Sequence, residues 1–116
     1  MHIHERQAER KRLNGLMLKS PMKVYAVFRD LGRRVFAEGA LSRKHKELTA
    51  LAVAVSQNCF DLIDHRVEEV LDLGATEAEI AETLDIGLLM GGTLATKSVR
   101  HAFAVMGQLK EARPER

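Results

Sequence analysis

The sequence has 116 residues, of which 46% are hydrophobic and 29% are charged, and its formal net charge at pH 7 is +2. This length supports one hydrophobic core, and the hydrophobic share excludes a disordered polyelectrolyte. No apolar run reaches about 18 residues and the N-terminus is charged from Glu5 onward, so we expect neither a membrane span nor a secretory signal. The single cysteine excludes an internal disulfide and a zinc site built from cysteines. These features predict a cytoplasmic protein.

The charges are distributed unevenly along the chain. Residues 1–46 carry 12 Lys and Arg against 4 Asp and Glu, whereas residues 47–116 carry 6 against 12. A basic segment can contact nucleic acid or anionic lipid, but no pattern of interleaved aromatic or glycine residues supports RNA binding here. We therefore expect no nucleic-acid or membrane partner. Residues 1–20 are interpreted as a basic N-terminal arm that docks as a short helix, and residues 21–116 as a helical domain.

The composition favours helices, because 29 residues are Ala or Leu and only 18 are Val, Ile or Thr. No proline lies between residues 22 and 113, so no ring interrupts a helix there. Apolar residues at three- and four-residue intervals predict an amphipathic helix from Met22 to about Val35. Gly39 is expected to form the C-terminal cap of this helix.

Two further helices are predicted in the middle of the chain. Ser42 is the expected N-cap of a helix from residue 43 to about residue 57. The centre of this helix, LTALAVAV, is apolar or small on every side, and we expect it to be buried all round. The next helix is expected from about Cys59 to Leu73, ending at Gly74.

The C-terminal part of the chain predicts two more helices. Thr76 and Glu79 have the spacing of a capping box, which opens a helix through about Met90. After the pair Gly91–Gly92, a last helix is expected over residues 93–110. The predicted fold class is therefore all-α, a single-domain bundle of five to six helices joined by short loops.

The apolar segments exceed what so short a bundle can cover. Both LTALAVAV and the segment LLMGGTLA would need partners, and Gly91, Gly92 and Ala95 are small enough to let another helix approach closely. We therefore expect a homo-oligomer that buries the surplus apolar surface.

Three stretches carry a family resemblance: KELTALAVAVSQNCFDLIDHR, LGATEAEIAETL and LLMGGTLA. Together they resemble the carboxymuconolactone decarboxylase family, whose alkylhydroperoxidase D-like members are thiol peroxidases with an antioxidant role. In that family a Glu opens the buried helix, a Cys-x-x-Cys-x-x-x-His motif follows twelve residues later, and a Gly-Ala lies eight residues beyond the His. Glu47, Cys59 and Gly74–Ala75 stand at the matching positions here. The resemblance covers the chain from about Pro21 to Met106, and it implies a dimer or a hexamer formed as a trimer of dimers.

The same register shows two departures from the family motif. Leu62 occupies the place of the second cysteine, which attacks peroxide in the redox-active relatives, and Arg66 occupies the place of the histidine. His65 lies one residue early. With Cys59 alone, an intramolecular dithiol cycle is impossible.

Helix periodicity places Cys59 and Arg66 on one face of their helix and His65 on the other, within reach of Asp61. If Glu47 faces the same pocket, as the resemblance implies, Arg66 is its natural partner. Such a pair would replace a proton-relaying Glu–His couple by a fixed ion pair, because Arg stays protonated near neutral pH.

The candidate catalytic residues are therefore Cys59, Glu47, His65 and Arg66, and each has a structural alternative. Cys59 is either a small buried apolar residue or a thiol activated by Arg66 and a helix N-terminus. Glu47 either lines the pocket or serves the first turns of its helix. His65 is either a surface residue paired with Asp61 or a base.

The other histidines are interpreted as structural. His45 and His101 have no partner at a helical spacing, and the pair His2 and His4 is too small a ligand set for a metal. No cofactor or metal is expected, because no phosphate-cradling glycine-rich loop is present either.

Three functions remain open at this point. The first is an alkylhydroperoxidase D-like thiol oxidoreductase that reduces peroxide at Cys59 and uses an external thiol reductant or a neighbouring subunit's thiol to resolve it. The second is an acid–base decarboxylase that binds a small carboxylate through Arg66, with Glu47 or His65 moving protons. The third is a non-catalytic oligomeric scaffold in which Glu47 and Arg66 are purely structural.

Overall fold

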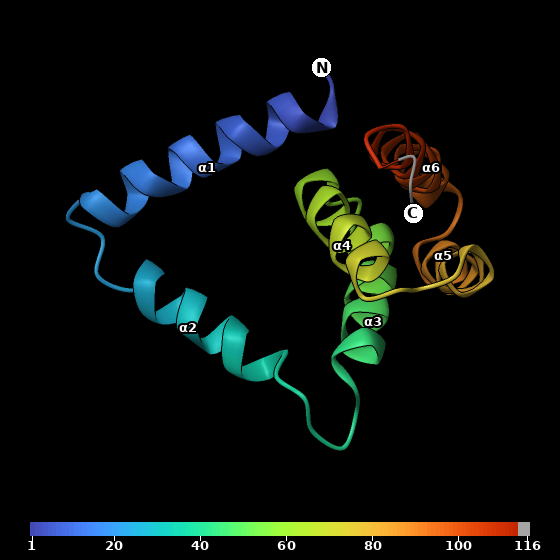
Figure 1. Ribbon diagram of the computed structural model, residues 1–116, viewed down its shortest axis with the longest axis horizontal. Coiled ribbons are helices and arrows are strands. Elements are labelled where there is room, and N and C mark those ends of the chain that lie inside the picture. Colours follow the sequence, from blue (N-terminus) through green and yellow to red (C-terminus); the bar gives the residue numbers. More distant parts are fainter. Residues whose placement is uncertain (114–116) are drawn as a thin grey trace.

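In the computed structural model, which describes residues 1–113, all regular secondary structure is helical (Figure 1). The elements in chain order are α1 (Ile3–Lys19), α2 (Tyr25–Val35), α3 (Arg43–Ser56), α4 (Phe60–Asp72), α5 (Glu77–Gly91), the short 3-10 helix η1 (Thr93–Ala95) and α6 (Thr96–Glu111). The predicted all-α class is confirmed. No helix of the described residues is long and apolar enough to cross a membrane.

Local signals in the sequence fix most helix boundaries. The Ser42 hydroxyl accepts a hydrogen bond from the backbone N–H of His45 and caps α3, as expected. Thr76 and Glu79 form the predicted capping box at the start of α5. Gly74 follows α4 with φ +81°, a left-handed conformation that glycine adopts without steric cost.

The end of α2 differs from the prediction. This helix ends at Val35, and Gly39 does not cap it. Instead, the ammonium group of Lys46 donates hydrogen bonds of 2.8 and 2.7 Å to the carbonyl oxygens of Val35 and Ala37. A side chain from α3 therefore satisfies carbonyl groups at this helix end, and the local sequence around Gly39 contains no sign of it.

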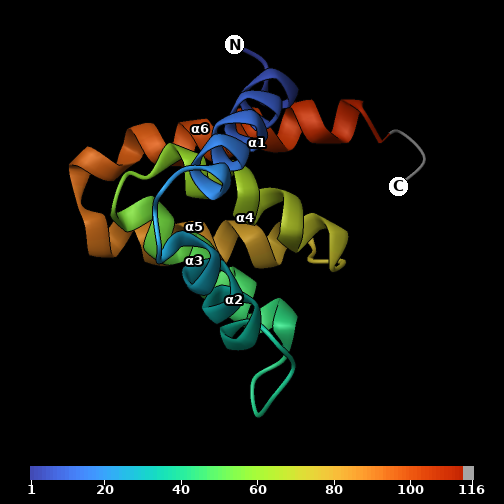
Figure 2. The same cartoon turned by 90° about the vertical axis from the view of Figure 1, so that its left-hand side faces the viewer.

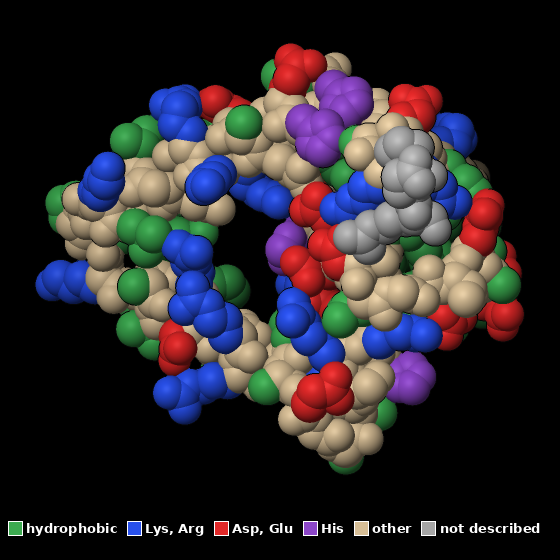
Figure 3. Space-filling view, viewed as in Figure 1, with side chains coloured by type: hydrophobic (Ala, Val, Ile, Leu, Met, Phe, Trp, Pro, Cys, Tyr) green, Lys and Arg blue, Asp and Glu red, His purple; other side chains and the backbone are tan. Residues whose placement is uncertain are grey.

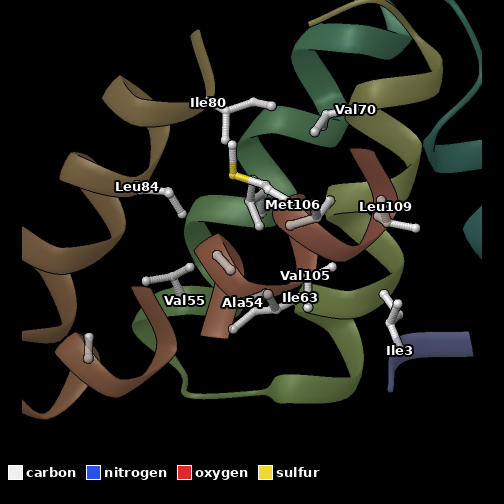
Figure 4. Close-up of a cluster of buried hydrophobic side chains, with 14 residues drawn as sticks. Ile3, Ala54, Val55, Ile63, Val70, Ile80, Leu84, Val105, Met106 and Leu109 are labelled. Carbon is white, nitrogen blue, oxygen red and sulfur yellow. The ribbon is translucent and has the colours of Figure 1, made fainter. Parts of the chain in front are cut away.

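Helices α3 to α6 form the bundle that contains the core (Figure 2). Packing is closest between α3 and α5, between α3 and α4, and between α4 and α6. The buried apolar side chains come from all four helices, and Ile3 at the start of α1 joins them (Figure 4). The prediction that α3 is buried all round is wrong, because Val53 lies exposed on its outer side while Leu51, Ala54 and Val55 enter the core.

Two glycines of α5 allow its close approach to α3. A Cβ atom on Gly87 would lie 2.8 Å from the side chain of Val55 and 2.9 Å from the carbonyl oxygen of Ala52. A Cβ atom on Gly91 would lie 2.9 Å from the Cα atom of Ser56. The close approach that we expected at Gly91 between subunits is therefore already made inside one chain.

The segment α1–α2 (Ile3–Val35) stands apart from the bundle (Figures 1 and 2). Only the first turns of α1 pack on α4 and α6, through Ile3 and the polar side chains that follow it. The second helix, α2, contributes no buried residue. Between this segment and the bundle the molecule is hollowed, and this hollow contains the candidate site (Figure 3).

Candidate functional site

The hollow between α2 and the bundle has a volume of about 720 Å³, within the range of small-molecule sites. All four candidate catalytic residues line it: Glu47 from α3, Cys59 at the start of α4, and His65 and Arg66 from α4. Five arginines and three carboxylates lie along its wall: Arg10, Arg29, Arg33, Arg43, Arg66, Glu47, Asp61 and Glu69. Cationic side chains gather on the α2 side of the opening (Figure 3).

The expected ion pair between Glu47 and Arg66 is present. A nitrogen of the Arg66 guanidinium donates a hydrogen bond of 2.8 Å to Oε1 of Glu47, whose residue surface is only 2% exposed. The Arg66 guanidinium also lies 4.2 Å from the centre of the Phe36 ring, which holds it by a cation–π contact. Because a buried carboxylate needs a partner, this pair fixes α3 to α4 at the floor of the hollow.

Cys59 is half-buried, has no disulfide partner and forms the N-cap of α4 with an extended backbone. Its backbone N–H donates to the carbonyl oxygen of Ala54, at 3.0 Å. The preceding residue, Asn58, has φ 54°, and its side-chain oxygen accepts a 2.6 Å hydrogen bond from the buried Ser98. The tight turn before α4 thus directs the thiol to the hollow instead of into the core.

The predicted orientation of His65 is wrong. His65 lines the same hollow as Cys59 and Arg66, and the structure gives it no hydrogen bond to Asp61 within residues 1–113. The helical wheel failed for two reasons: Cys59 precedes the first helical residue of α4, and α2 covers the face that we expected to meet solvent. Burial lowers the pKa of His65 below its ordinary value, and the neighbouring charge of Arg66 lowers it further. Both effects favour the uncharged form of its imidazole, whose free ring nitrogen can accept a proton.

A second polar cluster on α4 was not predicted. Asp64 is 1% exposed, and its carboxylate accepts hydrogen bonds from Arg6 of α1 at 2.7 and 3.0 Å. His101 of α6, which we interpreted as isolated, lies 2.8 Å from the same carboxylate and stacks on the ring of Phe60 at 4.2 Å. The partners lie 37 and 58 residues away in the sequence, so no local spacing reveals them.

The structure offers no site for a metal within the described residues, where no three His, Cys, Asp or Glu side chains are grouped closely enough. The ring nitrogen of His2 caps α1 by accepting a hydrogen bond from the backbone N–H of His4. The two rings also stack on each other. This terminal pair is thus part of a helix cap.

Comparison with known proteins decides the family. The sequence model of the carboxymuconolactone decarboxylase family matches residues 23–105, which span α2 to α6. The chain belongs to the carboxymuconolactone decarboxylase family. Among solved structures, a member of this family from Thermotoga maritima, described as having a possible part in the antioxidative response, is similar with a TM-score of 0.86 and 28% identity, over 93% of this chain and 92% of that one.

Other members of the family are also similar. A carboxymuconolactone decarboxylase family protein of Legionella pneumophila, solved in its apo form, gives a TM-score of 0.69 at 30% identity, over 91% of this chain and 88% of that one. An uncharacterised protein of the cox locus of Paracoccus denitrificans is 33% identical over 85 residues, which are 73% of this chain and 77% of that protein. An uncharacterised protein of Cupriavidus necator is 30% identical over 78% of this chain and 80% of its own length.

Membership in the carboxymuconolactone decarboxylase family, which includes the alkylhydroperoxidase D-like proteins, confirms the predicted relationship and the six-helix fold. The structure shows where the two departures from the redox motif lie. Leu62 and Arg66 both line the hollow at the positions of the second cysteine and the histidine. The roles of the four candidate residues stay predictions.

Proposed function

We propose that this carboxymuconolactone decarboxylase family protein is an alkylhydroperoxidase D-like thiol oxidoreductase that reduces peroxides at Cys59. The observation that carries the proposal is the half-buried thiol at the wall of a hollow of about 720 Å³, which it shares with the imidazole of His65. The Thermotoga relative, with its possible part in the antioxidative response, supports the same chemistry.

The proposed reaction has two stages at the sulfur of Cys59. In the first, the thiolate attacks the terminal oxygen of the peroxide, the O–O bond breaks, and the alcohol leaves with one proton while Cys59 becomes a sulfenic acid. In the second, an external thiol attacks the sulfenic sulfur, releases water and forms a mixed disulfide, and a second thiol then displaces Cys59. The two external thiols are oxidised to a disulfide as the peroxide is reduced.

His65 and Arg66 have different roles in this scheme. The uncharged His65 accepts the thiol proton and returns it to the leaving alkoxide, which is general acid–base catalysis by one group. Arg66 stays protonated, so it moves no proton. Together with Glu47 it holds the wall of the hollow beside the thiol.

The acid–base decarboxylase alternative is weakened by the same ion pair. That alternative assigned a substrate carboxylate to Arg66, but Glu47 already binds this guanidinium and Phe36 covers it. A substrate would have to displace a buried carboxylate, which costs free energy. The thiol experiment below distinguishes peroxide reduction from the scaffold alternative, in which none of these residues is catalytic.

We also propose that the protein acts in the cytoplasm as a homo-oligomer, a dimer or a hexamer built as a trimer of dimers. The cytoplasm supplies the reduced thiols that the second stage consumes. Apolar side chains on α2 and its N-cap, at the end of α5 and on η1 are exposed to a degree that favours association; they are Val24, Val27, Phe28, Leu31, Val35, Ile86, Leu89, Met90 and Leu94.

The test uses the fact that Cys59 is the chain's single cysteine. We expect hydrogen peroxide and cumene hydroperoxide to convert Cys59 to a sulfenic acid that dimedone traps in the native protein, and a small thiol to restore it. His65→Gln should slow the oxidation roughly 10²-fold, as loss of an acid–base group does. His45→Gln is the matched control, because His45 is exposed and lies outside the hollow. A thiol that reacts only after denaturation would favour the scaffold.

A further inference from the structure

One face of α2 is directed at the hollow and carries a regular pattern. Tyr25, Arg29 and Arg33 are four residues apart and line the hollow together with Phe28 and Phe36. Residues at this spacing form one stripe along a helix, so α2 presents guanidinium groups and aromatic rings side by side. The Arg29 guanidinium lies 5.9 Å from the centre of the Tyr25 ring. This stripe faces α4, where Cys59 lies.

The arginines of this stripe differ from Arg43 and Arg66 in the same wall. The remaining wall arginine, Arg10, donates a hydrogen bond of 2.7 Å to the backbone carbonyl oxygen of Asp61. Arg66 pairs with Glu47, and Arg43 pairs with Glu69 at 2.8 Å. Arg29 and Arg33, by contrast, have no carboxylate partner among residues 1–113. Their charges therefore leave one side of a partly apolar cavity positive and not neutralised by the chain itself (Figure 3).

We propose that this hollow binds an amphipathic carboxylate, whose head group lies on Arg29 and Arg33 and whose apolar body runs along the aromatic rings toward Cys59. A guanidinium donates two parallel hydrogen bonds to a carboxylate, and two of them one helical turn apart provide a cationic end to the cavity. Phe28, Phe36 and Leu62 supply the apolar wall. The volume of about 720 Å³ accommodates a ligand of medium chain length.

This inference rests on the proposed peroxide reduction where it names a substrate class. The substrate is then a hydroperoxide of a carboxylic acid in preference to hydrogen peroxide. The Cys59 thiolate takes the terminal oxygen, the hydroxy acid leaves with a proton from His65, and an external thiol reduces the sulfenic acid.

Tyr25 gives a direct readout of binding, because it is the only tyrosine of the chain, which has no tryptophan. We expect decanoate to change the Tyr25 fluorescence saturably and decanol to bind at least about tenfold more weakly, since it lacks the charge that pairs with the arginines. Arg29→Gln and Arg33→Gln should each weaken decanoate binding by roughly tenfold. Arg34→Gln is the matched control, because Arg34 lies outside the hollow and pairs with Asp30 at the surface.

Equal affinity for decanoate and decanol, or an equal loss in Arg34→Gln and Arg29→Gln, would overturn the site. Decyl phosphate that binds more tightly than decanoate would overturn the assignment of a carboxylate. A second measurement compares Cys59 oxidation by linoleic acid hydroperoxide with that by cumene hydroperoxide. We expect the carboxylate-bearing peroxide to react at least about tenfold faster and decanoate to inhibit it competitively.

The two proposals fail in distinguishable ways. Decanoate binding without Cys59 oxidation by any peroxide supports the carboxylate site and contradicts the peroxide reduction. Oxidation at equal rates by both peroxides, with no decanoate binding, overturns the carboxylate site and leaves the thiol chemistry standing.

Discussion

Arg6 of α1 and Asp64 of α4 form a two-pronged ion pair, with hydrogen bonds of 2.7 and 3.0 Å, across 58 residues of sequence. The Asp64 carboxylate is almost completely buried, whereas the Arg6 side chain is one-quarter exposed. His101 contacts the same carboxylate from α6. One buried charge therefore joins three helices, and it connects the N-terminal helix to the element that begins at Cys59.

Arg6→Gln should destabilise the protein by about 2–3 kcal/mol, because it leaves the buried Asp64 carboxylate with His101 alone. Urea unfolding measures this free energy. Arg12→Gln is the control: its pair with Glu9 is exposed on the same helix, and its loss should leave the free energy of unfolding close to that of wild type. Adding Asp64→Asn to Arg6→Gln should recover part of the loss, and a further additive loss would contradict this role for the pair.

The lowered pKa of His65 predicts a pH dependence of stability. Below its ordinary pKa of about 6.5, the unfolded chain binds a proton that the folded protein excludes because of burial and the charge of Arg66. The free energy of unfolding therefore falls as the pH drops from about 6.5 toward the folded pKa, and His65→Gln should flatten this slope.

NMR titration of the His65 ring checks the cause. Its pKa should lie below the ordinary value of about 6.5, and Arg66→Gln should raise it by removing a positive neighbour while Glu47 stays. An unchanged His65 pKa in Arg66→Gln would assign the effect to burial and to the charges of Arg10 and Arg43.

The double change Leu62→Cys and Arg66→His rebuilds the redox motif of the family on this chain. We expect it to gain thiol-dependent peroxide consumption, because Cys59 then has a dithiol partner on the wall of the same hollow. The gain should be accompanied by a loss of about 1–3 kcal/mol of stability, since Glu47 loses the guanidinium that satisfies it. Arg66→His alone measures that loss, and equal peroxide rates in the double variant and wild type would mean that this wall does not support the relay.

Assembly can be tested at Leu89, whose side chain is exposed on α5. Leu89→Glu removes no core contact, so we expect it to preserve folding and to lower the mass measured by light scattering behind a sizing column. Lys97→Glu, at an exposed polar position, should leave the mass unchanged. Gly92→Glu is a poorer probe, because Gly92 has φ +75° and any side chain there is strained.

Apolar burial should dominate this association, so 1 M salt should leave the assembly largely intact. A wild-type mass equal to one chain at micromolar concentration would contradict the proposed homo-oligomer.

The helices were predictable where their signals are local. Ser42, Thr76 with Glu79, and Gly74 set their boundaries within a few residues of sequence. The end of α2 was not predictable, because Lys46 of α3 donates a hydrogen bond to the carbonyl oxygen of its last residue. Burial of α3 was overestimated, because side-chain polarity does not indicate which apolar residues a single chain leaves uncovered.

The candidate site was predictable in part for the same reason. The Glu47–Arg66 pair follows from a family register and a charge match. His65 was assigned to the wrong face, since the helical wheel of α4 contains no information about the position of α2. The amphipathic pattern of residues 22–35 does not show that Arg29 and Arg33 line the hollow, because only the path of the chain around it brings them there. Asp64 and His101 meet through tertiary packing alone.

The α1–α2 segment spans the hollow like an arch and is attached to the bundle near its two ends. Ile3 and Arg6 make the first attachment. The second is at the end of α2, where the Lys46 ammonium group donates to a backbone carbonyl oxygen and the Arg66 guanidinium lies over the Phe36 ring. The span between them, including the 17-residue α1 of about 25 Å, has no buried side chain beyond the first turn. A small rotation at either attachment therefore produces a larger displacement at the middle of the span, so the Arg6–Asp64 ion pair and the Lys46 hydrogen bonds limit how wide the entrance to Cys59 opens.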